Sequence, residues 1–383
     1  MKLIFVSVYL NIHQLPFCME LKKKLDSDFS YISTDPITED RVQMGFEDMD
    51  RQYDFVIRSY SSPEQMEKAR SLIQTADVAI MGSCPDELLN LRLKTGKLTF
   101  KYSERFFKGG NSLKERVRYF LSAFRHIRPL ERENIYFLCA SAYTAADVNR
   151  YYNFHGRCFR WGYFRETIFV DESKLAQSKV RNFIIWVGRF CHWKHPESVI
   201  QIANRFRKSG MNVHIEMVGD GETRDEILKL IKMNNLENMI TLPGALPPEV
   251  VQEKMRKAGI ALFTSDYKEG WGVVINEAMN AGCAVVASEA MGAVPFLMKD
   301  RVNGLQFPYN DVDKSYELIK ELMEKPDFAE YLGCQAYKTI TEEWSVQNAV
   351  NRLFQLIDTI QKNGNPADLF KSGPCSLAPS EIQ

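Results

Sequence analysis

Two carboxylates whose spacing suits ligand chemistry stand at Glu269 and Glu277. The stretch that contains them directly follows the apolar, strand-like run 259–264, so Glu269 should lie on the loop where that strand ends. Gly270 and Gly272 let the backbone approach a ligand, and a helix that begins there directs unpaired N–H groups toward a phosphate. The pattern places Glu277 two turns into that helix. We therefore predict a sugar-nucleotide site, with one carboxylate for sugar hydroxyls and the other for ribose hydroxyls.

A basic loop is expected at the end of another strand. Gly188 stands at a turn after the apolar run 183–187, and Arg189 and Lys194 follow on the same loop. A guanidinium can bond two phosphate oxygens at once, and an ammonium supplies a compact positive charge, so this loop suits a diphosphate. The alternative is a solvated basic loop without a ligand.

Two glycine turns follow the next strand-like runs. Gly219 opens a Gly-Asp-Gly turn after the run 213–218, and Gly244 and Ala245 lie in a rigid turn after the run 239–242. The Gly-Asp-Gly pattern taken alone is ordinary turn chemistry. The second turn could bond the edge of a base through its backbone, although a purely structural turn is the simpler interpretation of that segment in isolation.

The elements that must position these loops follow from the pattern of the whole chain. Short apolar runs alternate with longer amphipathic segments, which is typical of parallel sheets covered by helices. We predict an α/β fold of two Rossmann-like, doubly wound parallel-sheet domains, at 1–170 and 183–344, joined by a linker at 171–182. A helix over 345–360 should pack back on the first domain, and the tail 361–383 should be mobile. Ligands of such sheets bind beyond the carboxyl ends of the strands, where the candidate loops fall.

Composition argues against several classes of protein. A chain of 383 residues suits two domains of about 150 to 200 residues each. Its 49 basic and 49 acidic residues leave no net charge to attract nucleic acid. Eight scattered cysteines without a Cys-x-x-Cys pair favour reduced thiols over a disulfide framework. No stretch approaches the roughly 18 apolar residues of a membrane span, so we expect a cytoplasmic protein.

Taken together and in order, these segments resemble the retaining nucleotide-sugar glycosyltransferases of the GT-B type, in glycosyltransferase family four. The resemblance covers roughly residues 183–344. It implies the GT-B architecture, in which two Rossmann-like domains face each other across a cleft. It also implies a retaining transfer of a hexosyl-type sugar without a metal, a cofactor or an enzymic nucleophile, because same-face attack lets the leaving phosphate accept the proton of the acceptor.

The resemblance gives each candidate a role. Arg189 and Lys194 would neutralise the donor diphosphate, which is also the leaving group. Glu269 would contact the transferred sugar, beside backbone N–H groups near Trp271 and Gly272. Glu277 would hold the ribose. The other donor-binding positions are backbone contacts of the glycine loops: Gly188, Gly219, Gly244, Ala245 and Gly270.

Three positions depart from the pattern of that family. His195 stands where a glycine usually follows the lysine, which changes the loop without removing the charge of Lys194. After Gly292 the sequence reaches Phe296 without the glutamate often found there, and this puts one donor contact in doubt. Trp271 replaces the more common phenylalanine.

The first domain offers less specific candidates for binding the acceptor. His13 and Gln14 follow the first strand-like run and Glu104 follows another, so these three are the acceptor-side candidates. His13 could instead be a capping or surface residue, and Glu104 could form an ion pair with Arg105 or a neighbour. Residues 101–132 carry nine Lys or Arg against three Glu, with interleaved aromatics. They could contact an anionic membrane peripherally, or form a helix with its aromatics in the core.

The sequence thus predicts a glycosyltransferase that moves a sugar from a nucleoside-diphosphate sugar to a hydroxyl of a saccharide or lipid-linked acceptor. Synthesis of a cell-surface polysaccharide or glycolipid is the expected setting. One alternative is a nucleotide-sugar 2-epimerase of the same architecture, and another is a non-catalytic partner of a transferase. Asp311 and Asp313 form an apparent Asp-x-Asp metal motif, but Asp311 is better placed to cap a helix.

Overall fold

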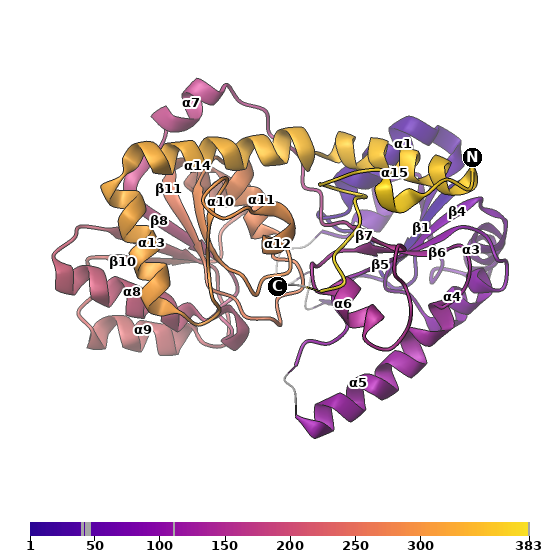
Figure 1. Cartoon of the computed structure of the whole chain (residues 1–383), viewed down its shortest axis with the longest axis horizontal. Helices are drawn as coiled ribbons and strands as arrows, with labels where there is room; N and C mark the ends of the chain where they lie inside the picture. Colours follow the sequence, from indigo (N-terminus) through magenta and orange to yellow (C-terminus); the bar gives the residue numbers. More distant parts are fainter. Residues whose placement is uncertain (40–41, 43–46, 110–111, 382–383) are drawn as a thin grey trace. The chain divides into compact units, whose positions relative to one another are not determined.

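The computed structural model describes residues 1–39, 42, 47–109 and 112–381. The chain forms two compact units (Figure 1). Unit 1 contains Met1–Glu166 together with Val346–Gln383, and unit 2 contains Thr167–Ser345. The chain therefore leaves unit 1 once, builds the whole of unit 2, and returns.

Unit 1 is built on a sheet of seven parallel strands in the order β3-β2-β1-β4-β5-β6-β7. The strands are β1 (Leu3–Ser7), β2 (Phe29–Ser33), β3 (Val56–Arg58), β4 (Val78–Met81), β5 (Thr99–Ser103), β6 (Ile135–Cys139) and β7 (Cys158–Arg160). The helices between them are α1 (Leu15–Leu25), α3 (Pro63–Thr75), α4 (Asp86–Leu93), α5 (Leu113–His126) and α6 (Thr144–Asn149). Strands β1 and β4 are buried along their whole length, as expected for a parallel sheet covered on both faces.

Unit 2 has a sheet of six parallel strands in the order β10-β9-β8-β11-β12-β13. The strands are β8 (Val180–Val187), β9 (His214–Val218), β10 (Ile240–Gly244), β11 (Ala258–Phe263), β12 (Ala284–Ser288) and β13 (Leu305–Phe307). The helices are α7 (Glu172–Gln177), α8 (Pro196–Ser209), α9 (Arg224–Met233), α10 (Pro248–Lys257), α11 (Val274–Asn280), α12 (Val294–Leu297), α13 (Val312–Glu324) and α14 (Pro326–Lys338).

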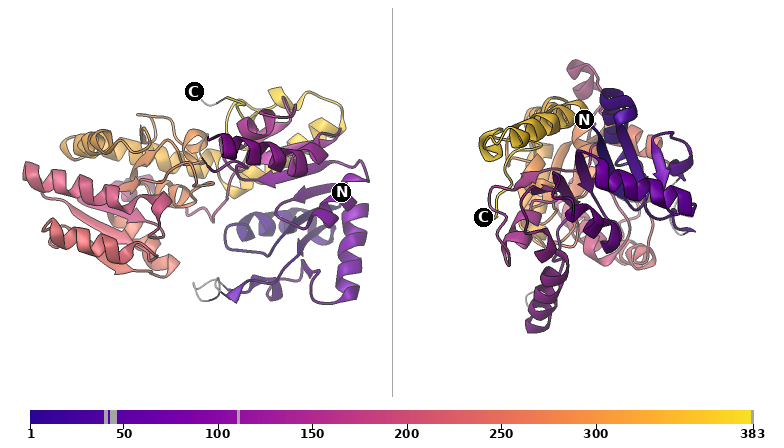
Figure 2. Two further views of the ribbon diagram at one scale, coloured as in Figure 1. Left: turned by 90° about the horizontal axis from the view of Figure 1, so that it is seen from below. Right: turned by 90° about the vertical axis from the view of Figure 1, so that its right-hand side faces the viewer.

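Two layers of helices cover the sheet of unit 2. Helix α8 packs against α9 and α13, and α11 packs against α10 and α14 (Figure 2). Apolar side chains of the strands and of helices α8, α9 and α13 form one core, with Ile184, Phe206 and Leu318 among its buried members. The predicted cap is confirmed, because Asp311 Oδ1 accepts a hydrogen bond of 2.8 Å from the Lys314 N–H at the start of α13.

The ends of the units differ from the boundaries expected from the sequence. The segment 171–182, expected as a linker, contains α7 and the beginning of β8. Helix α15 (Val346–Gln361) belongs to unit 1, where it packs on α1 and accepts a 2.9 Å hydrogen bond from Lys24 Nζ at Asn351 Oδ1.

The tail after α15 follows the edge of the sheet in unit 1 instead of lacking contacts. The Cys375 N–H donates to the carbonyl of Arg160 over 2.8 Å, and the Ala378 N–H donates to the carbonyl of Cys158 over 2.9 Å. Cys375 is also fully buried. Residues 375–378 of the tail are therefore paired with β7, whereas the sequence led us to expect a mobile segment. The last residues, 382–383, lie outside the described part of the chain.

Candidate functional site

The order of the strands in unit 2 identifies the edge where a ligand would bind. Strands β8 and β11 are neighbours although β9 and β10 lie between them in the sequence, so the chain changes its direction of winding at this pair. Loops at the carboxyl ends of two such strands diverge and leave a crevice, which is the usual ligand site of a doubly wound sheet. The loop after β8 carries Arg189 and Lys194, and the loop after β11 carries Glu269.

Hydrogen bonds hold these two loops together. Thr264, directly after β11, donates from its hydroxyl to the carbonyl of Lys194 over 2.6 Å and accepts a 3.0 Å bond from the indole of Trp186. Two residues later, the Asp266 N–H donates to the carbonyl of Trp193 over 2.8 Å. The backbone that carries Lys194 is thereby fixed to the loop that carries Glu269.

The two side chains meet directly. Lys194 Nζ forms an ion pair with Glu269 Oε2, and only 14% and 15% of the two side chains are exposed. The hydroxyl of Ser265 lies 3.2 Å from the same carboxylate oxygen and donates to it. Lys194, predicted to bind the diphosphate, is therefore in direct contact with Glu269, predicted to contact the sugar.

Arg189 is placed differently from Lys194. Its side chain is exposed, and its guanidinium lies over the ring of Trp193 at 4.8 Å from the ring centroid. Burial raises the pKa of the Cys191 thiol, and a hydrogen bond with Arg189 acts in the opposite direction. Arg189 thus lies on the same loop as Lys194 but against an aromatic ring, where a planar cation is stabilised.

The Gly-Asp-Gly turn packs directly on the basic loop. The Gly188 N–H donates to the carbonyl of Val218 over 3.0 Å, and the Phe190 N–H donates to the carbonyl of Asp220 over 2.8 Å. Gly219 has a φ of +137°, and a Cβ atom there would lie 2.0 Å from the carbonyl oxygen of Gly188. Only glycine permits this close approach. The turn therefore has a packing role that the sequence pattern alone does not show.

The turn at Gly244 and Ala245, which was predicted to contact the base, lies next to the Gly-Asp-Gly turn. The Gly219 N–H donates to the carbonyl of Gly244 over 2.9 Å, so the loops after β8, β9 and β10 are hydrogen bonded in series. Gly244 has a φ of +85° with open space where a Cβ would be, and Ala245 beside it is exposed. This turn therefore leaves room for a ligand next to its backbone.

The loop between Glu269 and α11 is anchored by an aromatic cluster. Trp271 is 1% exposed, donates from its indole to Asn276 Oδ1 over 2.8 Å, and contacts Phe296 and Trp344 at centroid distances of 6.3 and 6.0 Å. Phe296, in the segment after Gly292 that lacks the glutamate often found in the family, thus belongs to this apolar cluster.

The position of Glu277 requires a correction. Helix α11 begins at Val274, so Glu277 lies in its first turn, whereas we expected it two turns into a helix. The helix starts late because Gly272 adopts a left-handed φ of +90° and Trp271 is buried, and together they keep the chain non-helical until Val273. Glu277 is partly exposed at this helix start.

Unit 1 has a pocket at the corresponding edge of its own sheet, where β1 and β4 are neighbours out of sequence. The pocket has a volume of about 430 Å³. All three acceptor-side candidates line it, together with Ser7, Val8, Tyr9, Asn11, Ser83, Lys101, Tyr102, Ser103, Arg105, Lys108 and Tyr163. The structure therefore brings His13, Gln14 and Glu104 together.

The three candidates differ in how they are held. Gln14 is 7% exposed and accepts a 2.8 Å hydrogen bond from the hydroxyl of Tyr31. The ring of His13 lies edge-on to Tyr163 at 5.9 Å. Glu104 accepts from the Tyr163 hydroxyl over 3.0 Å and pairs with Lys108 Nζ at 2.9 Å. The predicted alternative, an ion pair of Glu104 with Arg105 or a neighbour, is therefore confirmed, and the partner is the neighbouring Lys108.

Two further residues of this pocket were not anticipated. Lys101 donates from Nζ to the carbonyl of Gly82 over 2.5 Å, and burial lowers the pKa of Lys101. Arg105 pairs with Asp147 at 3.3 Å, and this carboxylate also accepts the N–H groups of Phe106 and Phe107. A lysine inside the apolar run of β5 was the available sequence signal for Lys101. Asp147 is 42 residues from Arg105, and no local pattern connects them.

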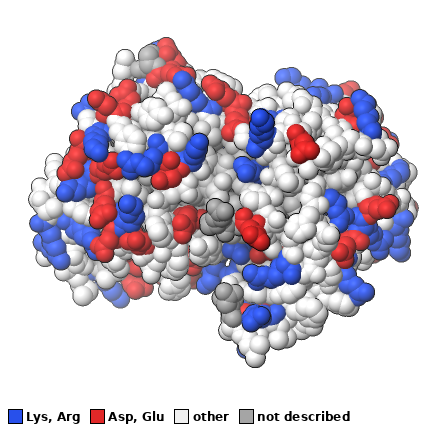
Figure 3. All heavy atoms as spheres, viewed as in Figure 1, with Lys and Arg blue, Asp and Glu red and all other residues white. Residues whose placement is uncertain are grey.

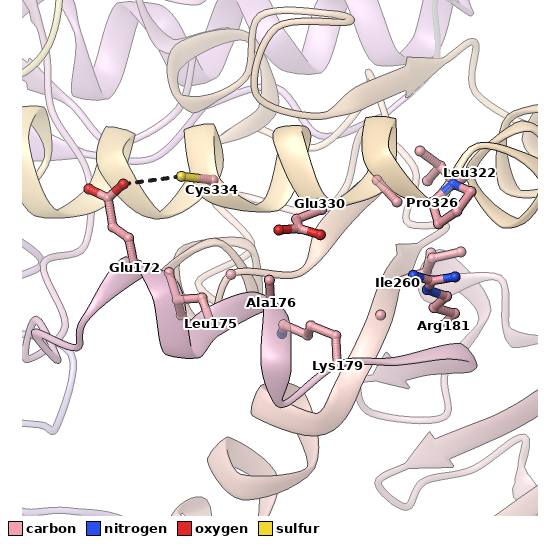
Figure 4. Close-up of a pocket in the computed structure, with 13 residues that line it drawn as sticks. Glu172, Leu175, Ala176, Lys179, Arg181, Ile260, Leu322, Pro326, Glu330 and Cys334 are labelled. Carbon is pink, nitrogen blue, oxygen red and sulfur yellow. Dashed lines mark hydrogen bonds between the residues drawn. The ribbon is translucent and has the colours of Figure 1, made fainter.

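Unit 2 has a pocket of about 130 Å³ at the amino ends of its strands, the edge of the sheet opposite to the candidate loops (Figure 4). It is lined by residues of α7 and α14 and by the amino ends of β8 and β11. Lys179 beside it donates from Nζ to the carbonyls of Ala281 and Met255 over 2.8 and 3.1 Å, and Cys334 donates to Glu172 over 3.4 Å. These polar groups satisfy one another and the backbone, so we assign this pocket to packing.

Comparison with known proteins finds a family that matches most of unit 2. The family described as glycosyl transferases group 1 matches residues 169–339. The chain is 25% identical over 173 residues to the alpha-D-kanosaminyltransferase of Streptomyces kanamyceticus, covering 45% of this chain and 44% of that protein. It is also 25% identical over 174 residues to the poly(ribitol-phosphate) alpha-N-acetylglucosaminyltransferase of Staphylococcus aureus, covering 45% and 34%. The chain thus matches less than half the length of these curated relatives, which are named as transferases and give no support to the 2-epimerase alternative.

Solved structures resemble the whole chain at low sequence identity. HepE of Anabaena, in complex with UDP, has a TM-score of 0.68 at 17% identity and covers 94% of this chain and 100% of its own. TarM has a TM-score of 0.66 at 13% identity, with 93% and 98% covered. These likenesses establish the architecture. The chain therefore has the two Rossmann-like units of the GT-B fold, and its residues 169–339 match the family described as glycosyl transferases group 1.

Proposed function

We propose that this chain is a retaining glycosyltransferase that moves a sugar from a nucleoside-diphosphate sugar, bound by unit 2, to a hydroxyl of a saccharide or lipid-linked acceptor. The observation that carries the proposal is the contact of Lys194 with Glu269 at the switch point of a group 1 glycosyl transferase domain. Relatives named for poly(ribitol-phosphate), poly(glycerol-phosphate), colanic acid, amylovoran and the O-antigen chain favour a role in cell-surface polysaccharide assembly.

Stabilisation of the leaving diphosphate is the main task of the proposed site. Negative charge develops on the phosphate as its bond to the sugar breaks, and fixed positive groups in a partly buried site lower the energy of that state. Lys194 is held in place by its loop contacts, and Arg189 on the same loop can bond two oxygens. We propose that these cations act without a metal and without a cofactor; unchanged activity in excess EDTA is the expected result.

The carboxylates have separate proposed roles. Glu269 neutralises Lys194 in the structure, and a bound diphosphate would supply a competing negative partner for that ammonium. Glu269 can then accept hydrogen bonds from hydroxyls of the transferred sugar. Glu277 at the first turn of α11 is proposed to accept the ribose hydroxyls, and the open backbone at Gly244 and Ala245 to contact the base. HepE, with structures in complex with UDP and with UDP-glucose, makes UDP-sugars the first donors to test.

The acceptor is proposed to bind in the pocket of unit 1. Its lining combines the aromatic ring of Tyr163, the carboxylate of Glu104 and the imidazole of His13, a mixture that suits a sugar with several hydroxyls. Gln14 is engaged with Tyr31, so we assign it to holding the turn before α1 and not to the acceptor. A saccharide acceptor should therefore lose affinity in Glu104→Gln more than in Gln14→Glu.

Substitution of the ion pair tests the donor site. Lys194→Ala should lower transfer, and hydrolysis of the donor, by about 100-fold or more, because it removes charge stabilisation from the leaving group. Glu269→Ala should lower both as well. Lys254→Ala is the matched control, since Lys254 forms a similar 2.9 Å pair with Glu216 elsewhere in unit 2. Wild-type activity in both Lys194→Ala and Glu269→Ala would refute the site.

A screen of donors without acceptor separates the remaining alternatives. UDP, GDP, ADP and TDP are added in turn, and the one that binds the native protein raises its melting temperature. The matching nucleotide sugars are then incubated with the protein. Slow release of free sugar fits a transferase, whereas conversion of the nucleotide sugar to its epimer would overturn the proposal.

We also propose that unit 1 contacts an anionic membrane through α5. Five large apolar side chains of this helix are 49–77% exposed, and their spacing puts them on one face: Leu113, Val117, Phe120, Leu121 and Phe124. Tyr119 and Ala123 are buried on the adjacent face. The predicted alternative, with the aromatics in the core, therefore holds for Tyr119 but not for Phe120 and Phe124.

Charge supports the choice of a membrane as the partner of this face. Lys114, Arg118 and Arg125 are exposed along the border of the apolar stripe, where their ends can reach lipid phosphates while the apolar side chains enter the bilayer surface. In Figure 3 the edge formed by α5 is mainly uncharged with scattered basic residues. In the described part of the chain no helix is long and apolar enough to cross a membrane.

Vesicle flotation tests the membrane contact. Wild-type protein should float with vesicles that contain phosphatidylglycerol and much less with pure phosphatidylcholine. The double variant Leu121→Gln and Phe124→Gln should lose flotation, whereas Met233→Gln, which changes an exposed methionine of unit 2, should keep it. Equal flotation of all three proteins would contradict the proposal, as would a concentration-dependent dimer that the double variant abolishes.

A further inference from the structure

His195 occupies a backbone position that ordinarily favours glycine. Its φ and ψ are +49° and +52°, the left-handed region, between the short helical turn His192–Lys194 and helix α8. A histidine there pays a conformational cost that glycine would avoid. The side chain is 18% exposed, so it has been brought inward instead of being left in solvent. The contacts of its ring explain why a histidine occupies this position.

Both ring nitrogens of His195 face carboxylates. Nδ1 lies 2.7 Å from Glu197 Oε1, and Nε2 lies 3.4 Å from Asp266 Oδ2. The hydroxyl of Tyr309 lies 3.3 Å from Nε2. An imidazole can donate from both nitrogens only when it is protonated, so this arrangement fits the imidazolium form. The two hydrogen bonds raise the pKa of His195 to about 9.

The elements around the ring bring charges of both signs. Glu197 comes from α8, Asp266 from the loop after β11, and Tyr309 from the segment after β13. Arg189, His192 and Lys194 are the basic residues of its own loop. Burial is the largest single influence on the pKa of Glu197 and would raise it, but the hydrogen bond from His195, a backbone hydrogen bond and the nearby His195 and His192 together lower it. The cluster is thus a cation held between two carboxylates, at the residue that follows Lys194 in the chain.

Asp266 connects this cluster to the proposed donor site. Its N–H donates to the carbonyl of Trp193 over 2.8 Å, and its carbonyl accepts the N–H of Glu269 over 3.1 Å. Asp266 is thus bonded to the residue before Lys194 and to Glu269 itself. A side chain that holds Asp266 in place therefore also holds the backbone on both sides of the Lys194–Glu269 ion pair. His195 is itself the residue next to Lys194.

We propose that His195 is a positioning residue whose imidazolium ties the loop of Lys194 to the loop of Glu269, so that the affinity of the site for a diphosphate depends on the charge of this ring. The proposal rests on the proposed function for the identity of the ligand. It does not make His195 a catalytic residue, because the ring is directed at Glu197 and Asp266 and acts through them.

Replacement by glycine separates this role from a backbone role. If only the backbone matters, His195→Gly relieves the left-handed strain and should bind ligand as well as the wild type or better. If the ring ties the loops together, the same variant should bind more weakly. Asp266→Asn is a second test that removes the carboxylate and leaves residue 195 unchanged. Its amide can still accept the Lys268 N–H, as Asp266 Oδ1 does over 2.7 Å.

Inorganic pyrophosphate is the probe, because it carries the diphosphate without a base or a sugar. By calorimetry at pH 7.5, we expect both variants to bind pyrophosphate about three- to tenfold more weakly than the wild type, a change of the size expected when a single tether is lost. The difference in pyrophosphate affinity between the wild type and the two variants should disappear between pH 8 and 10, as the ring of His195 loses its proton. Titration of pyrophosphate itself is common to all three proteins and cancels in the comparison. His155→Gln, at an exposed site of unit 1, is the control.

Hydrogen exchange measures the tether without any ligand. The N–H groups of Asp266 and Glu269 should exchange faster in His195→Gly than in the wild type at pH 7.5. Unchanged exchange together with wild-type pyrophosphate affinity across the pH range would overturn the proposal. If the wild type binds no pyrophosphate, the proposed donor site is wrong. Hydrogen exchange then still tests His195: faster exchange in His195→Gly supports the link between the two loops, and unchanged exchange refutes it.

Discussion

The protonated state of His195 predicts a stability change at alkaline pH that can be isolated by one substitution. Its pKa is about 9 in the folded protein against an ordinary value of 6.5. Because the folded value is the higher one, folding favours the protonated ring. The stabilisation is complete below about pH 6.5 and is lost as the pH rises through about 9. A loss in acid would have the opposite sign and would instead reflect Glu197, whose pKa is lowered.

The size of the effect follows from the difference between the two pKa values. Each unit of pKa difference corresponds to about 1.4 kcal/mol, and at pH 7 the linkage amounts to about 2.5 kcal/mol. Because 18% of the side chain is exposed, solvent screening reduces this, and we expect about 1 to 2 kcal/mol. His195→Gln keeps a side chain at the same left-handed position and cannot be protonated. The wild type should therefore exceed it in stability by about 1 to 2 kcal/mol at pH 7 and by much less at pH 10.

Tryptophan fluorescence suits the measurement because four of the five tryptophans, all except Trp161, lie in unit 2. Urea unfolding of the wild type and of His195→Gln is followed at pH 7 and pH 10, and only the difference between the two proteins is used. Other groups that titrate in this range contribute equally to both. A difference in the free energy of unfolding that is the same at both pH values would refute the assignment of the imidazolium.

The remaining predictions concern packing. Gly219→Ala should destabilise unit 2 by about 3 kcal/mol or more, because its Cβ would meet the carbonyl of Gly188 at 2.0 Å, whereas Gly210→Ala, with a φ of +71° and open space, should cost only about 1 kcal/mol. Arg92→Lys should destabilise unit 1 by about 3 kcal/mol, seen as faster hydrogen exchange in β4 and β5. The fully buried guanidinium of Arg92 donates to Thr99 and to four backbone carbonyls, and an ammonium cannot reach all of them.

Much of the fold can be read from the sequence because parallel strands buried on both faces appear as continuous apolar runs. The run at β1 and the run at β11 are examples, and both are almost wholly buried. The loops that follow such runs are predictable for the same reason. The tail after α15 escaped prediction because it pairs through its backbone with Cys158 and Arg160, and backbone pairing leaves no periodic signal in the side chains.

The candidate site shows where local patterns stop being informative. The Gly-Asp-Gly turn was weak evidence by itself because many turns contain these residues. In the structure, Gly219 is required by contact with Gly188, a residue 31 positions earlier in the sequence. The same holds for His195, which the sequence presents only as a missing glycine. Its significance depends on Asp266, which contacts it from the loop after a different strand. His195 departs from the family pattern, adopts a strained left-handed backbone conformation, and has its partners in the candidate site. A residue with these three properties is therefore a better functional candidate than one that only matches the pattern.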